Sequence, residues 1–349
     1  MTTEKIKKAM AVVGENAGDD YILKPDMHAG LFSDEAPELA WILKSAELEG
    51  VADKYDECDK DAIAVQDKFK LYSERARRWV FLTACCSALL LAVATLFGQP
   101  DQEPLARTLF IVLSIAAIVF GFLASTHIKL VENMKLLENW MKKRANAEMQ
   151  RLDYFNRFIN CKLSDESASD PVFMRLLQLE FFRRFQLDMQ LSYYTQRGKQ
   201  HGAIAEKAAT ISTWAMGAAG LAAGIAGFLG SSLHPKWAAI AGFGFICQAF
   251  ATNVLNREAI NQDRRNEERY GRTKDVLKNL RMRLDKVRAQ VAAGNPVVLA
   301  KYVEAVHEQL SLEHRQWTDD ISMASKALVE LEAQLKELET GAQPKQGSQ

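Results

Sequence analysis

Two pairs of long apolar runs constrain this chain more than any other feature of its sequence. The four runs contain no Asp, Glu, Lys or Arg, are 18 to 22 residues long, and cover 79–97, 108–126, 208–229 and 237–254. A helix of roughly 20 apolar residues crosses about 30 Å of hydrocarbon, and only a helix or a closed barrel satisfies its backbone groups there. The sequence therefore predicts an all-α membrane protein with four transmembrane helices, arranged as two hairpins.

Basic residues flank both pairs of runs and are nearly absent from the short linkers within them. Those linkers contain only Arg107 and Lys236 as basic residues. The flanks contain Lys68, Lys70, Arg75, Arg77, Arg78, Lys129, Lys135, Lys142, Lys143 and Arg144 around the first pair, and Arg197, Lys199, Lys207, Arg257, Arg264 and Arg265 around the second. Lys and Arg favour the cytoplasmic side, so we expect both termini and the central region to be cytoplasmic.

Most of the chain lies outside the runs, since the mean hydropathy is −0.16 and 25% of the residues are charged. We expect this part to be helical too. The predicted organisation is an N-terminal segment 1–35, a stalk helix 36–78, hairpin 79–126, a helical region 127–207, hairpin 208–254, a basic helix 255–293, a coiled-coil helix 297–339 and a disordered tail 340–349.

Local signals place several helix ends. Ser33 or Asp34 is a suitable cap for a helix with Pro37 in its first turn, and that helix is expected to run unbroken into the first apolar run. Asp170 is a suitable cap for a helix that starts at Pro171. The segments 128–161 and 256–293 are each expected to be one continuous helix.

The last predicted helix contains a sustained heptad stripe that is typical of a coiled coil. The stripe is Val303, His307, Leu310, His314, Trp317, Ile321, Ala324, Leu328, Leu331, Leu335 and Leu338. It predicts either self-association or packing along the other stalk helices of the chain. The two histidines are either polar layers that set the register or a pH-sensitive pair. Alternatively, the seam is shifted onto Leu299, Tyr302 and Val306.

Small and mildly polar residues mark the second pair of runs. Gly220 and Gly224 are in GxxxG register, which lets helix backbones approach closely in lipid. This predicts packing within the hairpin, oligomer packing or a pore-lining helix. Gln248 is either a hydrogen-bond partner between helices or a pore-lining group. The absence of charged residues from the runs argues against an ion-coupled transporter and fits a passive pore.

The segment 257–288 has eleven basic and six acidic residues. The cluster of Arg264, Arg265, Arg269, Arg272 and Lys274 surrounds Tyr270, and this combination of positive charge with an aromatic face suits a nucleotide or oligonucleotide. A solvated helix that anchors to anionic lipid heads is the alternative. We expect no cofactor, metal site or enzymatic activity, because no catalytic or metal-binding motif is present.

The flanks of the first pair resemble those of a known family. Ala76-Arg77-Arg78-Trp79 precedes it, and His127-Ile128-Lys129 and Trp140 follow it. The segment 36–161 is similar to the SLATT superfamily, two-transmembrane effector domains of bacterial conflict systems, and the second pair would be a divergent second copy. The resemblance implies assembly into pores that collapse the potential of the inner membrane. It also implies control by a nucleotide from a companion nucleotidyltransferase, which either opens the pore or keeps it shut.

The leading hypothesis from the sequence is an oligomeric, ligand-regulated ion-conducting pore of the bacterial inner membrane that acts in antiphage defence. The cluster on 264–274 would bind the ligand, while Gly220, Gly224 and Gln248 would line the pore or pack the spans. The alternatives are a non-conducting coiled-coil scaffold and a helical pore-forming toxin. An active transporter is the least favoured, because the spans carry no charge.

Overall fold

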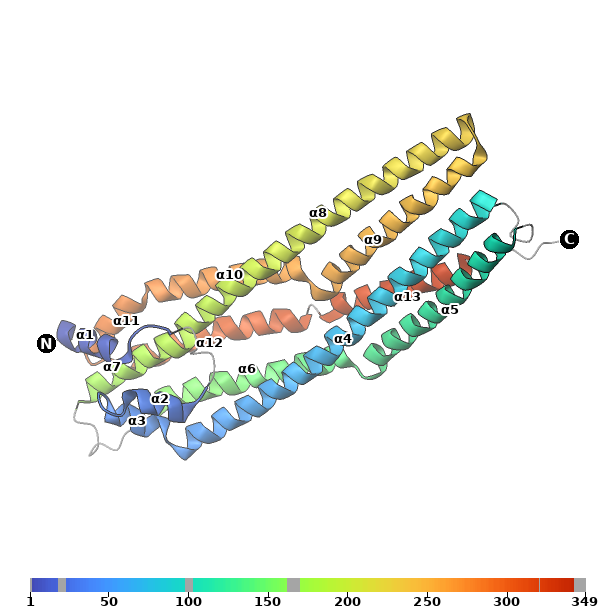
Figure 1. The fold of residues 1–349 in the computed structure, drawn as a ribbon. Coiled ribbons are helices and arrows are strands. Elements are labelled where there is room, and N and C mark those ends of the chain that lie inside the picture. The colour runs from blue at the N-terminus through green and yellow to red at the C-terminus, as the bar shows by residue number, and fades with distance from the viewer. Residues whose placement is uncertain (1, 18–22, 98–102, 162–169, 320, 342–349) are drawn as a thin grey trace. The chain divides into compact units, whose positions relative to one another are not determined.

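The computed structural model describes residues 2–17, 23–97, 103–161, 170–319 and 321–341, and every regular element in these ranges is a helix (Figure 1). In chain order these are α1 (Thr2–Val13), α2 (Pro25–Phe32), α3 (Pro37–Leu43), α4 (Ala46–Phe97), α5 (Pro104–Asn133), α6 (Leu136–Asn160), α7 (Pro171–Phe182), a π-helical turn (Arg183–Asp188), α8 (Met189–Ser232), a 3-10 turn (Pro235–Ala239), α9 (Ile240–Asn261), α10 (Asp263–Met282), α11 (Leu284–Ala292), α12 (Pro296–Asp319) and α13 (Ile321–Gly341).

The chain divides into two compact units, each built from three stretches of sequence. Unit 1 consists of Met1–Val65, Asn139–Gln200 and Arg265–Asp319. Unit 2 consists of Gln66–Glu138, His201–Arg264 and Asp320–Gln349, and it contains all four apolar runs. The helices α4 and α8 each enter unit 2 from unit 1 without a break.

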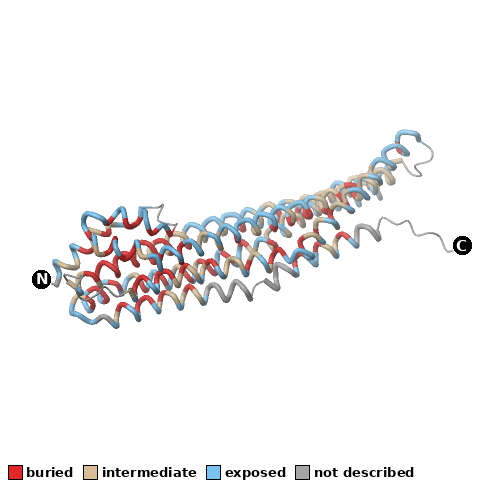
Figure 2. The backbone as a smooth tube through the Cα atoms, turned by 90° about the horizontal axis from the view of Figure 1, so that it is seen from below, coloured by how far each residue is buried: buried red, intermediate tan, exposed pale blue. Residues whose placement is uncertain are grey.

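Four helices are long and apolar enough to cross a membrane, as the sequence predicts. The apolar runs lie in α4, in α5, in α8, and in the 3-10 turn with α9. At most 22% of any of the four apolar windows is buried inside the chain. Most of their surface is therefore left for lipid or for other copies of the chain. Figure 2 shows the difference, with buried residues concentrated in unit 1 and exposed residues frequent along the spans.

The helix that leads into the first run starts later than the sequence predicts. A separate helix, α3, begins at Pro37, and its N-cap is Ala36 without a side-chain hydrogen bond, so neither Ser33 nor Asp34 caps it. Helix α3 ends at Leu43, and α4 starts at Ala46. The break is explained by burial: α3 turns Leu39, Ile42 and Leu43 completely into the core of unit 1, which one straight helix from residue 36 could not do. From Ala46 onward the helix is continuous into the span, as expected.

Each pair of spans is followed by a left-handed residue that the sequence does not predict. Lys135 has φ 46° and separates α5 from α6, and Gln262 has φ 54° and separates α9 from α10. The expected continuous helices over 128–161 and 256–293 are therefore wrong at these two points, and Arg283 marks a further break between α10 and α11. Side chains other than Gly, Asn and Asp seldom adopt this conformation. The two halves of the chain thus share an interruption at equivalent places.

Two predicted helix ends are confirmed. The Asp170 carboxylate accepts a hydrogen bond from the Phe173 backbone N–H at 3.1 Å, which caps α7, and Pro171 occupies the first turn. Gly294, with φ +88°, ends α11 in the left-handed region where glycine is preferred. The predicted disordered tail lies largely outside the described residues.

The core of unit 1 is built around α7 and the π-helical turn. Phe181, Phe182 and Phe185 are at most 3% exposed, and their rings meet those of Phe155 and Phe158 on α6 and Phe32 on α2. Helix α7 also contacts α1, α3, α11 and α12. The density of Phe and Leu in this stretch predicts such burial, because only a helix with neighbours on every side is apolar all round.

Small residues of α9 bring the spans of unit 2 together. A Cβ on Gly242 would lie 2.8 Å from the Cβ of Ala92 on α4, and a Cβ on Gly244 would lie 3.1 Å from the carbonyl oxygen of Ala219 on α8. On the other side of α4, the rings of Trp79 and Phe120 on α5 stack with centroids 5.5 Å apart. The close approaches depend on glycine at these two positions of α9.

The C-terminal helix α13 packs on its own chain. Leu331 and Leu335 of the predicted stripe are buried against Ala76, Val80, Ala124 and Ile128 of α4 and α5, and α13 also contacts α9. This packing agrees with the second alternative from the sequence, in which the stripe packs along other helices of the same chain. At least this part of the stripe is therefore covered within the chain. The side chains of His314, Trp317, Ile321, Ala324 and Leu338 lie outside the described residues.

Candidate functional site

A buried ion-pair network lies at the centre of unit 1. Glu180, near the end of α7, accepts hydrogen bonds from Arg183 Nε at 2.7 Å and from Arg288 Nε and Nη2 at 2.6 and 2.9 Å. The side chain of Arg183 is 0% exposed, and those of Glu180 and Arg288 are 1% and 5% exposed. One buried carboxylate is thus shared by two buried arginines, and the second positive charge needs further carboxylates.

The π-helical turn gives the network its second carboxylate. Asp188, at the end of that turn, accepts from Arg183 Nη1 at 2.8 Å and from Arg281 Nε at 2.7 Å. Burial by itself would lower the pKa of Arg183, but Glu180 and Asp188 outweigh it and the pKa is raised. The same balance, with Glu180 and Asp285, raises the pKa of Arg288. The network therefore joins α7, α10 and α11 through fully charged groups.

His307 is a second polar group at this core, on α12. Its ring lies 5.7 Å from that of Phe182, and its Nε2 has no hydrogen-bond partner in the described part of the chain. Burial, with a smaller contribution from Arg151, lowers the pKa of His307 from 6.5 to about 4. The histidine is therefore neutral at physiological pH.

We expect the stability of the protein to fall between pH 6.5 and pH 4 because of His307. The unfolded chain binds a proton in this window and the folded chain does not, so the free energy of unfolding falls by about 1.4 kcal/mol per pH unit. The apparent Tm of the purified full chain from pH 8 to pH 4 measures this. His307→Phe should make the slope shallower without removing it, because the lowered pKa values of Asp170 and Glu74 also cost stability as the pH falls. His234→Gln, at an exposed histidine, should leave the profile unchanged. An unchanged slope in His307→Phe would contradict the assignment.

The predicted ligand cluster lies on α10, but its members differ in exposure. Arg264, Arg265 and Arg272 are exposed, and Lys274 is partly exposed beside Asp275 at 3.4 Å. Arg269 is buried and donates to the Asn266 side chain at 2.7 Å. Tyr270 is 4% exposed, with its ring 5.5 Å from that of Tyr194 and 6.2 Å from that of Tyr193. The structure therefore does not bring a free aromatic face to the exposed cations of this cluster.

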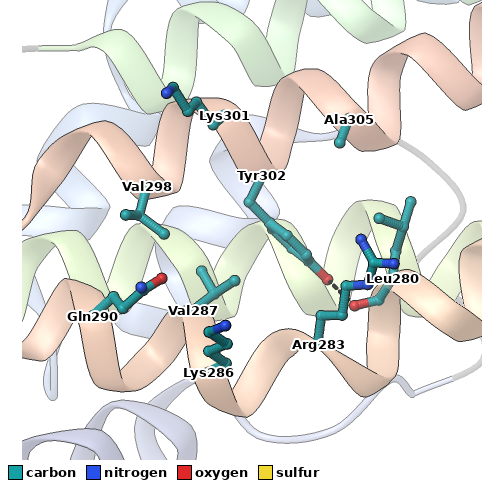
Figure 3. Close-up of a pocket in the computed structure, with 9 residues that line it drawn as sticks. All are labelled: Leu280, Arg283, Lys286, Val287, Gln290, Val298, Lys301, Tyr302 and Ala305. Atoms are coloured by element: carbon teal, nitrogen blue, oxygen red, sulfur yellow. Dashed lines mark hydrogen bonds between the residues drawn. The ribbon is translucent and has the colours of Figure 1, made fainter.

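A different group of basic residues lines a groove in unit 1, next to α11. Figure 3 shows the groove between the end of α10 with α11 on one side and α12 on the other. Its lining includes Arg283, Lys286 and Lys301 together with Tyr302. Arg283 and Lys286 are among the eleven basic residues of 257–288, but the sequence does not predict this site because Lys301 comes from a separate helix.

The predicted residues of the spans are all exposed. Gly220 and Gly224 on α8 would have nothing within 4 Å of an added Cβ, and the same holds for Gly217 and Gly227. In contrast, Ala222 and Ala226 on the same helix are buried. The glycines therefore do not pack within their own chain, unlike Gly242 and Gly244. Gln248 is also exposed, on α9.

Hydroxyl groups in the spans are satisfied by their own helices. Thr83, Thr95 and Thr213 each donate to the backbone carbonyl of the residue four positions earlier, at 2.8 to 2.9 Å. The protons of these three hydroxyls are therefore engaged within their own helices and do not bridge one span to another. At the ends of the spans, by contrast, side chains bond between helices: Arg77 donates to the Asn253 side chain at 2.7 Å, and Asn256 donates to Gln334 at 2.9 Å.

No protein-family model matches the chain, and neither the curated proteins nor the solved structures that were compared give a match. The class of the protein therefore follows from its own architecture. It is an all-helical protein with four helices long and apolar enough to span a membrane, which suggests a multi-pass membrane protein.

Proposed function

We propose that this protein is an oligomeric membrane effector that forms a regulated ion-conducting pore in the bacterial inner membrane. In this proposal the spans form two hairpins, and both termini and unit 1 are cytoplasmic. The resemblance of 36–161 to SLATT domains supports a role in antiphage defence. It also supports control by a nucleotide or oligonucleotide from a companion nucleotidyltransferase.

The open glycine face of α8 is the observation that carries the proposal. Gly217, Gly220, Gly224 and Gly227 recur at helical spacing on a span and contact no other part of the described chain. Glycines on a span permit close helix association in lipid. Because the partner is not within the chain, it would be another copy, and the spans would assemble around this face.

The chemistry of the spans favours passive conduction. The apolar runs have no ionisable side chain of the Asp, Glu, Lys or Arg type, and ion-coupled carriers rely on such groups. Since the hydroxyls of Thr83, Thr95 and Thr213 bond to their own helices, a conducting path would form between copies and not through a single four-helix unit. Exposed Gln248 is available to line such a path.

The membrane potential of bacteria that express the protein tests the proposal. A voltage-sensitive dye should report depolarisation that depends on the neighbouring gene or on phage challenge. Purified protein in potassium-loaded liposomes should release the ion under the same control. A stable oligomer in the membrane that never changes the potential would contradict the pore and favour a coiled-coil scaffold. Recovery of the protein as a soluble monomer without detergent would favour a pore-forming toxin.

A further inference from the structure

The groove beside α11 has the size and the walls of a small-molecule site. Its volume is about 400 Å³, within the range of ligand pockets. One wall comes from Leu280, Arg283, Lys286, Val287 and Gln290, and the other from Val298, Lys301, Tyr302 and Ala305. All of these residues belong to the stretch Arg265–Asp319 of unit 1.

The charge of the groove is positive and uncompensated. Arg283, Lys286 and Lys301 line it, and no carboxylate does. None of the three has an ion-pair partner among the described residues, and all three are exposed to solvent. Asp285, the carboxylate nearest in sequence to Arg283 and Lys286, is already paired with Arg288 at 2.7 Å.

The floor of the groove is apolar and fixed. Leu280 and Val287 are buried, and Tyr302 is 6% exposed. The Tyr302 hydroxyl donates to the Leu280 carbonyl at 2.9 Å, which anchors the ring across the two helices (Figure 3). In Figure 3 the Lys301 ammonium points away from Tyr302, so a ligand would draw it in by rotation of its flexible side chain.

We propose that this groove binds a soluble phosphate-bearing small molecule with a planar or apolar body, as a nucleotide has. The phosphates would meet Arg283 and Lys286, with Lys301 closing from the opposite wall. The body would lie against the half-buried side chains of Val298 and Ala305, above the buried Val287 and Tyr302. Guanidinium and ammonium groups are the usual partners of phosphate oxygens, and the apolar floor explains why inorganic phosphate alone would bind more weakly.

Occupancy of the groove would reach the buried network through one connection. Tyr302 is bonded to Leu280, and the next residue, Arg281, pairs with Asp188 of the π-helical turn. A ligand held between Arg283 and Lys301 would therefore bind two residues from the point where α10 joins the network. That this ligand controls a pore rests on the proposed function, whereas binding in the groove does not.

Binding of trinitrophenyl-ATP to the purified full chain in detergent, followed by its fluorescence, tests the proposal. Arg283→Gln, Lys286→Gln and Lys301→Gln should each weaken binding roughly tenfold, as expected for a lost charge-assisted contact. The triple variant should abolish it. The matched control is Lys7→Gln, Lys44→Gln and Lys54→Gln, which removes the same charge from exposed positions elsewhere in unit 1 and should leave binding unchanged. A third variant, Arg264→Gln, Arg272→Gln and Lys278→Gln, tests the rival cluster on α10 and is expected to bind the probe. Circular dichroism and Tm confirm that all three triple variants are folded.

Three results would overturn the proposal. The first is equal binding of the probe by the groove variant and the wild type. The second is loss of binding only in the α10 variant, which would place the site at the cluster on 264–274 that the sequence predicts. The third is binding of phosphatidylglycerol vesicles that the groove variant loses, without binding of the probe and without competition by ATP. This result would make the groove a site for lipid headgroups. Since no conductance is measured, a failed pore test with intact probe binding would count against the proposed function alone.

Discussion

Replacing Glu180 with glutamine is expected to lower the free energy of unfolding of unit 1 by about 3 to 5 kcal/mol. The substitution keeps the shape of the side chain but leaves Arg183 and Arg288 charged, buried and without their shared carboxylate. Hydrogen–deuterium exchange of the full chain in detergent measures the loss, and peptides from α7, the π-helical turn and α11 should lose protection first.

Asp285→Asn is the matched control for Glu180→Gln. Asp285 pairs with the same Arg288 at 2.7 Å, but its side chain is 88% exposed, so solvent already screens the pair and little stability should be lost. Replacing Glu180, Arg183 and Arg288 together with methionine should restore much of the stability, because no buried charge is then left unpaired: Asp188 keeps Arg281, and Asp285 is exposed to water. Equal protection in Glu180→Gln and Asp285→Asn would show that the buried network does not stabilise unit 1.

Gly242→Val is expected to lower the stability of the single chain, whereas Gly224→Val is expected to prevent its assembly into oligomers. At Gly242 the new side chain would collide with Ala92 and with the Ala88 carbonyl oxygen 3.2 Å away. Since that oxygen belongs to a helix backbone, the contact between α4 and α9 must open, at a cost of about 1 to 3 kcal/mol or more. The purified protein should then melt at a lower temperature whatever its oligomeric state.

At Gly224 the same substitution meets open space, so the fold of the single chain should persist while assembly is lost. Chemical cross-linking in membranes and mass measurement in nanodiscs should show a shift from oligomer to monomer, together with loss of any conductance. Gly271→Val, at an equally open glycine on α10 outside the spans, should change neither. Unaltered oligomers of Gly220→Val and Gly224→Val would remove the glycine face as the assembly surface.

The sequence predicts the features of this chain that are local. Uncharged runs identify four spanning helices because composition and length suffice, and Asp170 with Pro171 identifies a helix start because a cap lies within one turn of its partners. Phe-rich 173–187 identifies the core of unit 1 for the same reason. In each case the information lies within a few turns of helix.

The features that the sequence does not predict depend on pairs of residues far apart or on single dihedral angles. Glu180 and Arg288 are 108 positions apart, and nothing near either residue marks the other. Tyr270 looks available for stacking in the sequence, but Tyr193 and Tyr194 cover it. The groove combines Lys301 of α12 with Arg283 and Lys286 at α11, on the other side of the connection between these helices. Because the three residues are not consecutive along the chain, the sequence does not group them.

The left-handed residues Lys135 and Gln262 make the two connections of each pair of spans unlike. Helices α4 and α8 run from unit 1 into the spans as single α-helices, so one backbone hydrogen-bond ladder extends along the whole of each connection. The return connections, from α5 to α6 and from α9 to α10, are interrupted at a residue with positive φ, where that ladder stops. Each pair of spans is thus joined to the rest of the chain by one continuous helix and one broken helix.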